Sequence, residues 1–206
     1  KIGQTKKPVL MSTGLASLEE IEESIGILKN AGNEDLLIFH CVSSYPAPID
    51  QSHLSMIGML RKRFNVEVGL SEHTLGTTAA IAAVALGATA IEKHFILRRS
   101  DGGADSGFSL EPHEMRDLVD GTKNAWLSLG NNNFERSTIE EENIIFRRSL
   151  YFVKDLAEGE SISPDSVKSI RPGYGIAPKH LPDIIGKTVS KSVTIGDRVQ
   201  WDIINR

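Results

Sequence analysis

The sequence predicts an α/β protein in which a parallel sheet is followed by a small, mostly-β domain. Four apolar segments of strand length alternate with helical segments over residues 1–130, and this alternation is typical of a parallel sheet covered on both faces. From residue 149 onward, short strand-like runs separated by glycine turns take its place. We therefore expect one domain at residues 1–130 and another at 149–206. Residues 131–148, which open with three asparagines, are expected to be a linker.

Four strands and four helices are expected in the first domain. Ser17 is a suitable N-cap for the first helix, and Gly32 is a suitable residue to end it. Ser109 is expected to cap the last helix, with Pro112 in its first turn. The expected strands are residues 9–14, 35–42, 66–73 and 90–94. The expected helices are residues 17–32, 52–64, 74–87 and 109–129. Four such units are half of an eight-unit barrel, and a small doubly wound sheet is the open alternative.

The second domain has a different pattern. Residues 149–153 are expected to form a strand. Residues 154–160 and 191–197 form a weak internal repeat, in which an apolar step leads into a glycine turn followed by an acid. Residues 162–167 and 178–185 are expected to be short helical connectors.

The composition of the 206-residue chain excludes several classes of protein. Its formal net charge is −4, so a basic nucleic-acid-binding surface is not expected. No apolar run approaches the roughly 18 residues of a membrane span, so we expect no association with a membrane. Cys41 is the only cysteine, which excludes an internal disulfide and fits a reducing compartment. A cytoplasmic location is therefore expected.

Two histidines occupy matching positions at the ends of neighbouring strands. His73 ends the segment at residues 66–73 and His94 ends the segment at residues 90–94, with an alanine-rich helix between them. Residues at the carboxyl ends of neighbouring parallel strands face the same crevice, and imidazole is a common ligand of divalent metals. We therefore expect the two histidines to hold a metal. The alternative is that each is a strand-end residue hydrogen-bonded to the backbone.

Hydroxyl and charged side chains accompany the histidines. The strand ends carry residues 12–14 (Ser-Thr-Gly), 43–45 (Ser-Ser-Tyr), 71–73 (Ser-Glu-His) and 92–94 (Glu-Lys-His). We expect these hydroxyls, acids and the lysine to gather at one face of the sheet, where serines in equivalent positions would bind an anion. Any one serine is more often only a turn or capping residue.

Two further segments carry candidate binding residues. The glycine-rich loop at residues 98–109 includes Asp105, and such a loop can close over a substrate as a lid. A flexible surface loop is the alternative. In the small domain, Arg171 lies beside a Pro-Gly turn, which suits a fixed hydrogen-bonding role, although an ordinary surface turn has the same composition.

Four motifs, taken in order along the chain, resemble the sialic acid synthase family. They are residues 7–14 (Lys-Pro through Ser-Thr-Gly), 69–74 (Gly-Leu-Ser-Glu-His-Thr), 92–95 (Glu-Lys-His-Phe) and 171–173 (Arg-Pro-Gly). The resemblance extends over essentially the whole chain. It implies that residues 1–130 are the second half of a TIM (β/α)8 barrel and that residues 149–206 are a β-clip domain of the SAF, or antifreeze-like, type.

Within this family, residues 99–112, 148–151 and 169–175 resemble the enzymes that make pseudaminic acid. The implied reaction condenses phosphoenolpyruvate with 2,4-diacetamido-2,4,6-trideoxy-L-altrose and releases phosphate. Formation of N-acetylneuraminate or legionaminate is the alternative within the family.

The resemblance also implies roles for individual residues. His73 and His94 would hold Mn²⁺ or Mg²⁺ and would form the catalytic group together with Glu92. Two imidazoles suit Mn²⁺ better than Mg²⁺, which prefers oxygen ligands. The implied substrate-binding residues are Ser12, Ser43 and Ser71 for phosphoenolpyruvate, Tyr45 and Asp105 for the acetamido sugar, and Arg171 for its N-acyl group.

The resemblance implies a homodimer whose SAF domains are swapped, so that Arg171 completes the site of the partner subunit. The barrel of this family begins with four more strand units. We therefore expect the chain to be the C-terminal part of a longer enzyme and to be inactive alone.

Two alternatives lie outside the family. Paired strand-end histidines also occur in metal-dependent hydrolases built on a barrel, although the expected general-base aspartate at a final strand end is not seen. The small domain could also act as a sugar-binding or ice-binding module. Its mixture of acidic and basic residues lacks the regular threonine array that ice binding would need.

Overall fold

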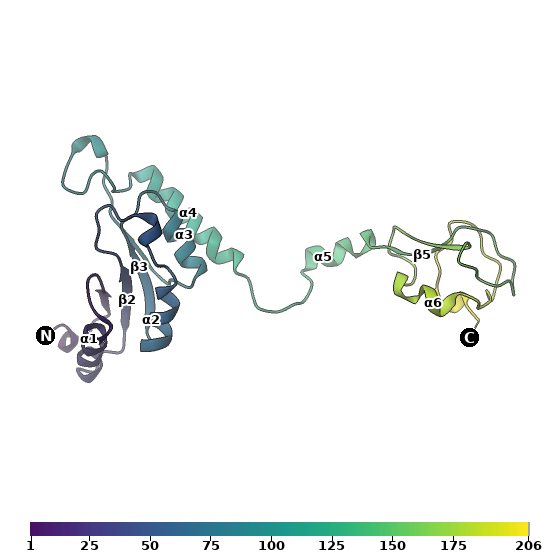
Figure 1. The fold of residues 1–206 in the computed structure, drawn as a ribbon, viewed down its shortest axis with the longest axis horizontal. Helices are drawn as coiled ribbons and strands as arrows, with labels where there is room; N and C mark the ends of the chain where they lie inside the picture. Colours follow the sequence, from purple (N-terminus) through teal and green to yellow (C-terminus); the bar gives the residue numbers. More distant parts are fainter. Residues whose placement is uncertain (206) are drawn as a thin grey trace. The chain divides into compact units, whose positions relative to one another are not determined.

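The structure, a computed structural model, describes residues 1–205 and contains two compact units. The first unit is Lys1–Asn131, and the second begins at Asn132. Each unit has its own core of buried apolar side chains, as expected of parts that fold around one core each. Figure 1 colours the first unit from purple to teal and the second from green to yellow. Within the described residues, no helix combines the length and the apolar character needed to cross a bilayer.

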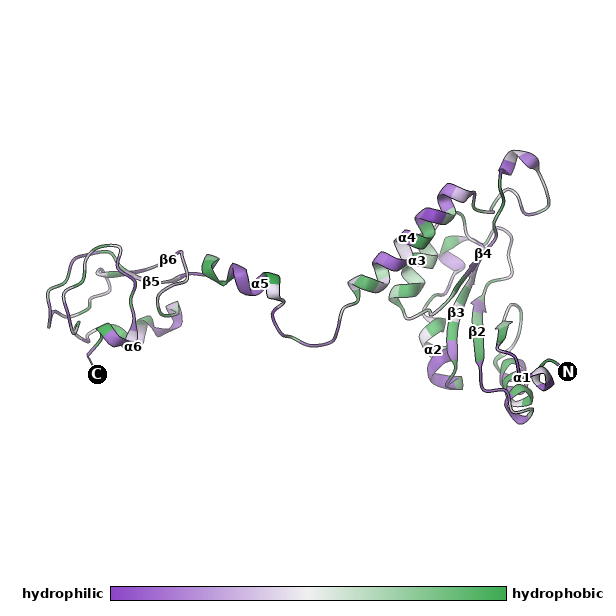
Figure 2. Cartoon of the chain, turned by 180° about the vertical axis from the view of Figure 1, so that it is seen from behind, coloured by the Kyte–Doolittle hydropathy of each residue, from purple (hydrophilic) through white to green (hydrophobic). Residues whose placement is uncertain are grey.

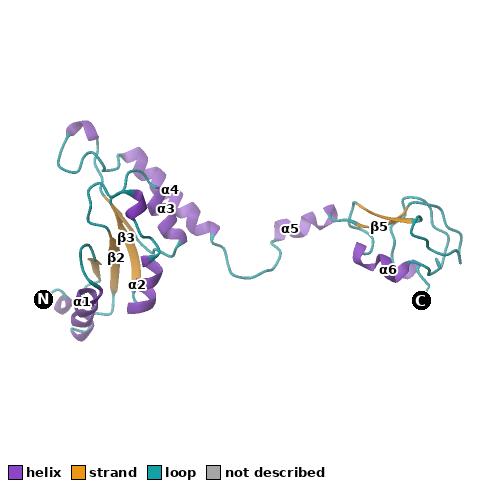
Figure 3. Ribbon diagram, viewed as in Figure 1, coloured by secondary structure: helices purple, strands orange, loops and turns teal. Residues whose placement is uncertain are grey.

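The first unit contains a parallel sheet of four strands in sequence order (Figures 1 and 3). The predicted succession of four strand–helix units is therefore confirmed. The strands are β1 (Val9–Ser12), β2 (Leu36–Cys41), β3 (Glu67–Glu72) and β4 (Ile91–Lys93). The α-helices are α1 (Leu18–Asn30), α2 (Met56–Phe64), α3 (Thr78–Ala85) and α4 (Pro112–Ser128). Short 3₁₀ helices cover Gly3–Thr5, Ile49–Gln51 and Arg99–Asp101.

Local signals at both ends of α1 explain its bounds. The Ser17 hydroxyl accepts a hydrogen bond from the backbone N–H of Glu20 at 3.3 Å, and the Glu20 carboxylate accepts one from the N–H of Ser17 at 2.8 Å. This reciprocal pair satisfies two backbone donors at the helix start. At the other end, Gly32 has a φ of +72°, a left-handed conformation that glycine adopts without a steric penalty. Both predicted ends of this helix are confirmed.

The two faces of the sheet have different environments. On β3, Val68 and Leu70 belong to the core formed with α1 and α2. Because successive side chains of a strand point to opposite faces, Ser71 lies on the face away from these helices. The register places Cys41 of β2 and Glu92 of β4 beside Ser71 on that same face. Figure 2 shows the hydrophobic residues concentrated along β2 and β3.

The predicted cap of the last helix is wrong by two residues. The helix α4 starts at Pro112 with Glu111 as its N-cap. Ser109 instead donates its hydroxyl to the carbonyl of Asp105 at 2.7 Å, and the N–H of Leu110 pairs with the carbonyl of His94 at 2.8 Å. The chain therefore stays extended through residue 110, because it is still bonded to the end of β4.

The second helix also begins later than predicted. It was expected from about Ser52, but α2 starts at Met56. His53 has a φ of +44°, which lies in the left-handed region and separates the preceding 3₁₀ turn from α2. A histidine in this conformation gives no clear signal in the sequence.

The second unit is built on one short antiparallel pair, β5 (Ser149–Phe152) and β6 (Val167–Ile170). The remaining chain contributes isolated bridges and turns around a core that includes Leu150 and Val199. A 3₁₀ turn at Pro178–His180 leads into α6 (Leu181–Ile184), so the predicted connector at residues 178–185 is confirmed.

The weak internal repeat corresponds to a structural pair. Leu156 and Val193, one from each copy, exchange both backbone hydrogen bonds, at 3.0 and 2.9 Å. The acid of each copy closes its own turn, because Glu160 accepts from the N–H of Ala157 and Asp197 accepts from the N–H of Thr194. The repeat thus encodes two copies of one acid-closed turn that pair with each other.

The predicted helical connector at residues 162–167 is wrong. Ser163 and Ser166 close a tight turn, in which the Ser166 hydroxyl accepts from the N–H of Ser163 at 2.9 Å, and Val167 already begins β6. Serine hydroxyls that bond to nearby backbone groups compete with helix formation. Within the segment predicted as a linker, a short helix α5 (Thr138–Glu142) starts at its N-cap Ser137.

Candidate active site

The carboxyl ends of β3 and β4 bring the two predicted histidines together. His73 directly follows β3, and His94 directly follows β4. Their ring centroids are 5.2 Å apart, and the rings meet edge to face at 67°. His73 is only 5% exposed, whereas the side chain of His94 is 32% exposed. The pair is therefore anchored on its His73 side and open to solvent on its His94 side.

Each imidazole has a neighbouring oxygen at its Nδ1 atom. His73 Nδ1 donates to the carbonyl oxygen of Val42 at 2.9 Å, since a carbonyl can only accept. His94 Nδ1 lies 3.5 Å from Oδ2 of Asp105. These contacts direct the Nε2 atoms of both rings to other partners. A carbonyl or a carboxylate on the second nitrogen is the usual arrangement for a metal-binding histidine, so the donor set fits a divalent cation. Among residues 1–205, no third His, Cys, Asp or Glu joins the pair to form a cluster of three.

Two aromatic rings pack against the pair. The ring centroid of Tyr45, a residue that is 55% exposed, lies 4.3 Å from that of His73, and the ring centroid of Phe108 lies 4.9 Å from that of His94. The backbone holds Tyr45 in place, because the N–H of Ala47 donates to the carbonyl of His73 at 2.9 Å. Tyr45 was predicted as a binding residue, but Phe108 was not. The available signal was a lone aromatic residue in an otherwise glycine- and serine-rich loop.

The loop that carries Asp105 is clamped at its base. The backbone N–H of Arg99 donates to the Glu111 carboxylate at 2.8 Å, and the Arg99 guanidinium forms an ion pair with Glu114. The Arg99 hydrogen bond holds the pKa of the Glu114 carboxyl below its usual value of 4.5. Inside the loop, the carbonyl of Asp105 accepts from the Ser109 hydroxyl. These contacts give the loop a defined conformation that places Asp105 beside His94.

Ser71 and Glu92 form the second predicted group that the structure brings together. The Ser71 hydroxyl donates to Oε1 of Glu92 at 2.7 Å, across neighbouring strands β3 and β4. Ser71 is buried, whereas Glu92 is exposed. The Ser71 hydroxyl and the Glu92 carboxylate therefore lie on the face of the sheet away from the helices, each two residues before one of the histidines.

The three predicted serines are not in equivalent positions. Ser12 pairs in register with Phe39, whereas Ser71 pairs with Cys41, two residues further along β2. This stagger amounts to about 6–7 Å along the strand direction. Ser43 lies beyond the end of β2, where a Cβ on Gly14 would come within 2.3 Å of the Ser43 hydroxyl oxygen. The serine hydroxyls at the strand ends therefore lie at different positions along the strand direction and not at equivalent ones.

The prediction that all charged strand-end residues share one face is wrong. Glu72 and Lys93 form an ion pair with each other, and they alternate with Ser71 and Glu92, so they point to the helix-covered face. Their side chains are 2% and 1% exposed. This buried pair lies behind the histidines, and sequence reasoning did not recognise it.

Arg171 lies in the second unit, at an exposed position just after β6. Its loop is held by Ser149, whose hydroxyl donates to the carbonyl of Pro172 at 2.7 Å and accepts from the N–H of Gly175 at 2.9 Å. A Cβ on Gly175 would approach the carbonyl oxygen of Leu150 to 2.4 Å, so only glycine fits there. The turn beside Arg171 is therefore fixed, as the Pro-Gly composition predicted.

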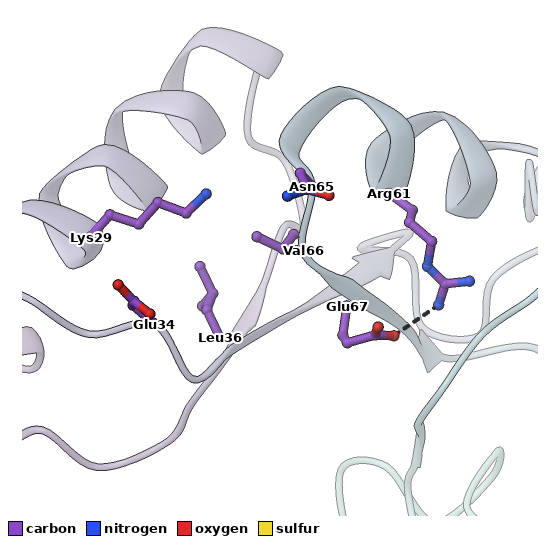
Figure 4. A pocket seen from close by; sticks show the side chains of 7 residues that line it. All are labelled: Lys29, Glu34, Leu36, Arg61, Asn65, Val66 and Glu67. Atoms are coloured by element: carbon purple, nitrogen blue, oxygen red, sulfur yellow. Dashed lines mark hydrogen bonds and ion pairs between the residues drawn. The ribbon is translucent and has the colours of Figure 1, made fainter.

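A different pocket lies at the opposite end of the sheet (Figure 4). It is lined by residues at the amino ends of β2 and β3, including Leu36 and Glu67. Arg61 in this pocket is already paired with Glu67 at 3.1 Å. Catalytic groups of parallel α/β folds gather at the carboxyl ends of the strands, so we assign the candidate site to the histidine end.

Comparison with known proteins identifies the family. Residues 1–134 match the NeuB family, and residues 147–204 match the SAF domain. The chain belongs to the NeuB family. The predicted fold class, half of a TIM barrel followed by a SAF domain, is confirmed by these matches together with the curved parallel sheet and the small antiparallel pair. The metal-dependent hydrolase alternative is left without support.

Individual relatives agree with this placement. A pseudaminic acid synthase of Campylobacter jejuni is 42% identical over 199 residues, which cover 97% of this chain and 58% of the relative. An N,N'-diacetyllegionaminic acid synthase of the same species is 37% identical, and the match covers 93% of this chain and 58% of the relative. The crystal structure of the spore coat polysaccharide biosynthesis protein SpsE from Bacillus subtilis has 30% identity and a TM-score of 0.61, over 100% of this chain and 63% of that one. The chain thus spans 58% of the length of both synthases.

Proposed function

We propose that the protein carrying this chain is a pseudaminic acid synthase, which condenses phosphoenolpyruvate with 2,4-diacetamido-2,4,6-trideoxy-L-altrose. The observation that carries the proposal is the histidine pair, in which Nδ1 of His73 is hydrogen-bonded to Val42 and Nδ1 of His94 faces Asp105, with Glu92 two residues before His94. The 42% identity to a relative named pseudaminic acid synthase supports the choice of product. The substrate and the lone Cys41 fit a cytoplasmic reaction.

In this reaction a carbon–carbon bond forms between C3 of phosphoenolpyruvate and the aldehyde carbon of the sugar. One water molecule is consumed and inorganic phosphate is released. Phosphoenolpyruvate carries a phosphate and a carboxylate, and both need hydrogen-bond donors. We assign Ser12, Ser43 and Ser71 to these groups; the single hydroxyl proton of Ser71, which is donated to Glu92 in the free chain, would turn to the substrate on binding. Their stagger along the strands suits an extended anion better than a single phosphate, because the hydroxyls lie at different levels.

Glu92 is proposed to exchange the proton at the aldehyde oxygen. In the free chain its Oε1 accepts a hydrogen bond from Ser71, so the carboxylate lies beside a serine that is proposed to bind phosphoenolpyruvate. Tyr45 and Asp105 are assigned to the sugar, because both are exposed side chains that lie beside the histidine pair. Arg171 is assigned to an N-acyl oxygen of the sugar, to which its guanidinium would donate a hydrogen bond.

His73 and His94 are proposed to hold Mn²⁺ or Mg²⁺ through their Nε2 atoms. When bound, such a cation supplies Lewis-acid polarisation of a carbonyl. The residues themselves orient this donor pair: Val42 holds the ring of His73, Asp105 faces Nδ1 of His94, and Tyr45 and Phe108 pack against the two rings. Loss of either imidazole is expected to abolish turnover.

The alternative product is legionaminic or N-acetylneuraminic acid, supported by the 37% identity to a legionaminic acid synthase. Phosphate release from phosphoenolpyruvate with Mn²⁺ separates these possibilities. The assay uses the protein at the full length of the relatives, and the 206-residue chain is assayed alongside it. For the full-length protein, we expect turnover with the trideoxy-altrose and none with N-acetylmannosamine. The reverse preference would make the protein a neuraminate synthase, and no turnover with any candidate sugar would contradict the enzymatic proposal.

We further propose a homodimer in which the SAF domain of one subunit completes the site of the other. A mixing experiment tests this. Proteins at the full length of the relatives that carry His73→Ala or Arg171→Ala are each expected to be inactive. If the domains are swapped, random pairing of equal amounts restores about a quarter of the parental activity, because roughly half of the dimers contain one complete site. If each subunit uses its own Arg171, every site carries one defect and no activity returns.

A further inference from the structure

The ion pair between Glu72 and Lys93 is exceptional in this molecule. Of the ion pairs within residues 1–205, it is the only one whose two side chains are both buried, at 2% and 1% exposure. The surface pairs Arg61–Glu67 and Arg63–Glu22 leave both partners at least 36% exposed. Burying two charges carries a large desolvation penalty, and a well-packed apolar pair is often equally stable. Stability alone therefore gives little reason for this pair.

The contacts of the pair point to another role. Glu72 and Lys93 are register partners on β3 and β4, and each immediately precedes one histidine of the candidate site. The Glu72 carboxylate also accepts from the N–H of Thr74 at 2.6 Å, and the Lys93 ammonium also donates to the carbonyl of Thr74. Both polar groups of the Thr74 backbone are thus held by side chains on the helix-covered face of the sheet. Since His73 lies between Glu72 and Thr74, its backbone is held on both sides.

We infer that Glu72 and Lys93 are positioning residues, which set the orientation and separation of the His73 and His94 rings. The ammonium links the end of β4 to the turn that follows β3, and backbone pairing of the strands does not extend to that turn. An apolar pair would fill the same space without directional contacts to the turn. The geometry of the imidazoles is a property of the chain itself, and only its consequence for metal affinity rests on the proposed function.

The decisive variant is the double substitution Glu72→Gln/Lys93→Met. It removes both buried charges, retains similar volumes and keeps an oxygen that can accept from the N–H of Thr74. It is therefore expected to fold, whereas Lys93→Met alone would leave a buried unpaired carboxylate and unfold at a lower temperature. The matched control is Arg61→Met/Glu67→Gln, which removes the ion pair between α2 and β3 at the other end of the sheet, in the pocket of Figure 4.

The first measurement is made on the metal-free chain by NMR with ¹⁵N-labelled histidine. The parent and the control are expected to show His73 as the Nδ1–H tautomer, bonded to Val42, and a nuclear Overhauser effect between the His73 and His94 rings. The double variant is expected to show a mixture of tautomers and loss of this effect. A double variant whose tautomer and ring contact match those of the parent would overturn the inference.

The second measurement is the affinity for Mn²⁺. The double variant is expected to bind about 10- to 100-fold more weakly than the parent, the usual effect of losing support behind a metal ligand, while the control keeps the parental affinity. Unchanged affinity in the double variant would count against the inference. If the parent itself binds no Mn²⁺, the metal part of the proposed function fails, and the NMR result still decides the positioning role.

Discussion

Gly69 is the position in β3 where one methyl group should do most damage to the candidate site. Its Cβ, if present, would lie 2.7 Å from two atoms of the Phe39 ring and 2.7 Å from the carbonyl oxygen of Ala90. The Ala90 oxygen also accepts the backbone hydrogen bond of Leu70, at 2.9 Å. In a Gly69→Ala variant, the Phe39 ring could shift, but the backbone at Ala90 could move only by disturbing the pairing of β3 with the segment that leads into β4.

The expected loss follows from this difference between the two contacts. Overpacking of a tight interior typically costs about 1–3 kcal/mol, and the upper half of that range applies here because one of the contacted atoms belongs to the backbone. A loss of about 2–3 kcal/mol should lower the melting temperature of a unit of this size by roughly 5–15 °C. Because Ser71 and His73 lie on the same strand or just after it, the resonances of both should shift.

Chemical denaturation followed by circular dichroism measures this loss. Gly58→Ala is the matched control, because a Cβ on Gly58 in α2 meets nothing within 4 Å, and it should raise the unfolding free energy by about 0.5–1 kcal/mol. The double variant Gly69→Ala/Phe39→Leu should recover only part of the loss, since the Ala90 contact remains. Parental stability in Gly69→Ala would refute the reasoning.

Three further predictions concern contacts around the site and in the second unit. Arg99 lowers the pKa of Glu114 in the folded state, so this pairing stabilises the fold above the usual carboxyl pKa of 4.5 and loses its effect as the pH falls below that value. Glu114→Gln should therefore lower the melting temperature near neutral pH. A difference in melting temperature from the parent that persists undiminished in acid would contradict this. Phe108→Ala should cost about 3–5 kcal/mol of local stability and shift the His94 ring resonances, and unchanged His94 signals would argue against the contact. Ser149→Ala should cost about 1–3 kcal/mol in urea unfolding because it strips the Arg171 turn of two hydrogen bonds, and a neutral effect would mean that the turn is held by its own backbone.

The features that depend on neighbours in the sequence were predicted well. The Ser17 cap, the end of α1 at Gly32 and the two acid-closed turns of the internal repeat are all local, because each is determined within a few residues of the signal. The histidine pair was also predictable. Two apolar runs of strand length that end in the same residue must place these residues at the same edge of a parallel sheet.

Features that depend on contacts between distant segments were missed. The N-cap moved from Ser109 to Glu111 because the chain before it pairs with the end of β4, and Phe108 was overlooked because its partner His94 lies across the loop. One local feature was also missed: the turn at residues 162–167 was mistaken for a helix, because serines that favour a local turn have no distinct period.

By itself, the sequence determined the order of strands and helices in the first unit, the placement of the two histidines at one end of the sheet and the family to which the chain belongs. Only the tertiary structure decided how those groups are distributed in space. It placed Ser71 and Glu92 on one face and Glu72 and Lys93 on the other, and it staggered Ser12 against Ser71. The physical reason is that local propensity and hydrophobic period depend on adjacent residues, whereas facing and register are set by how strands pair with one another and pack against helices.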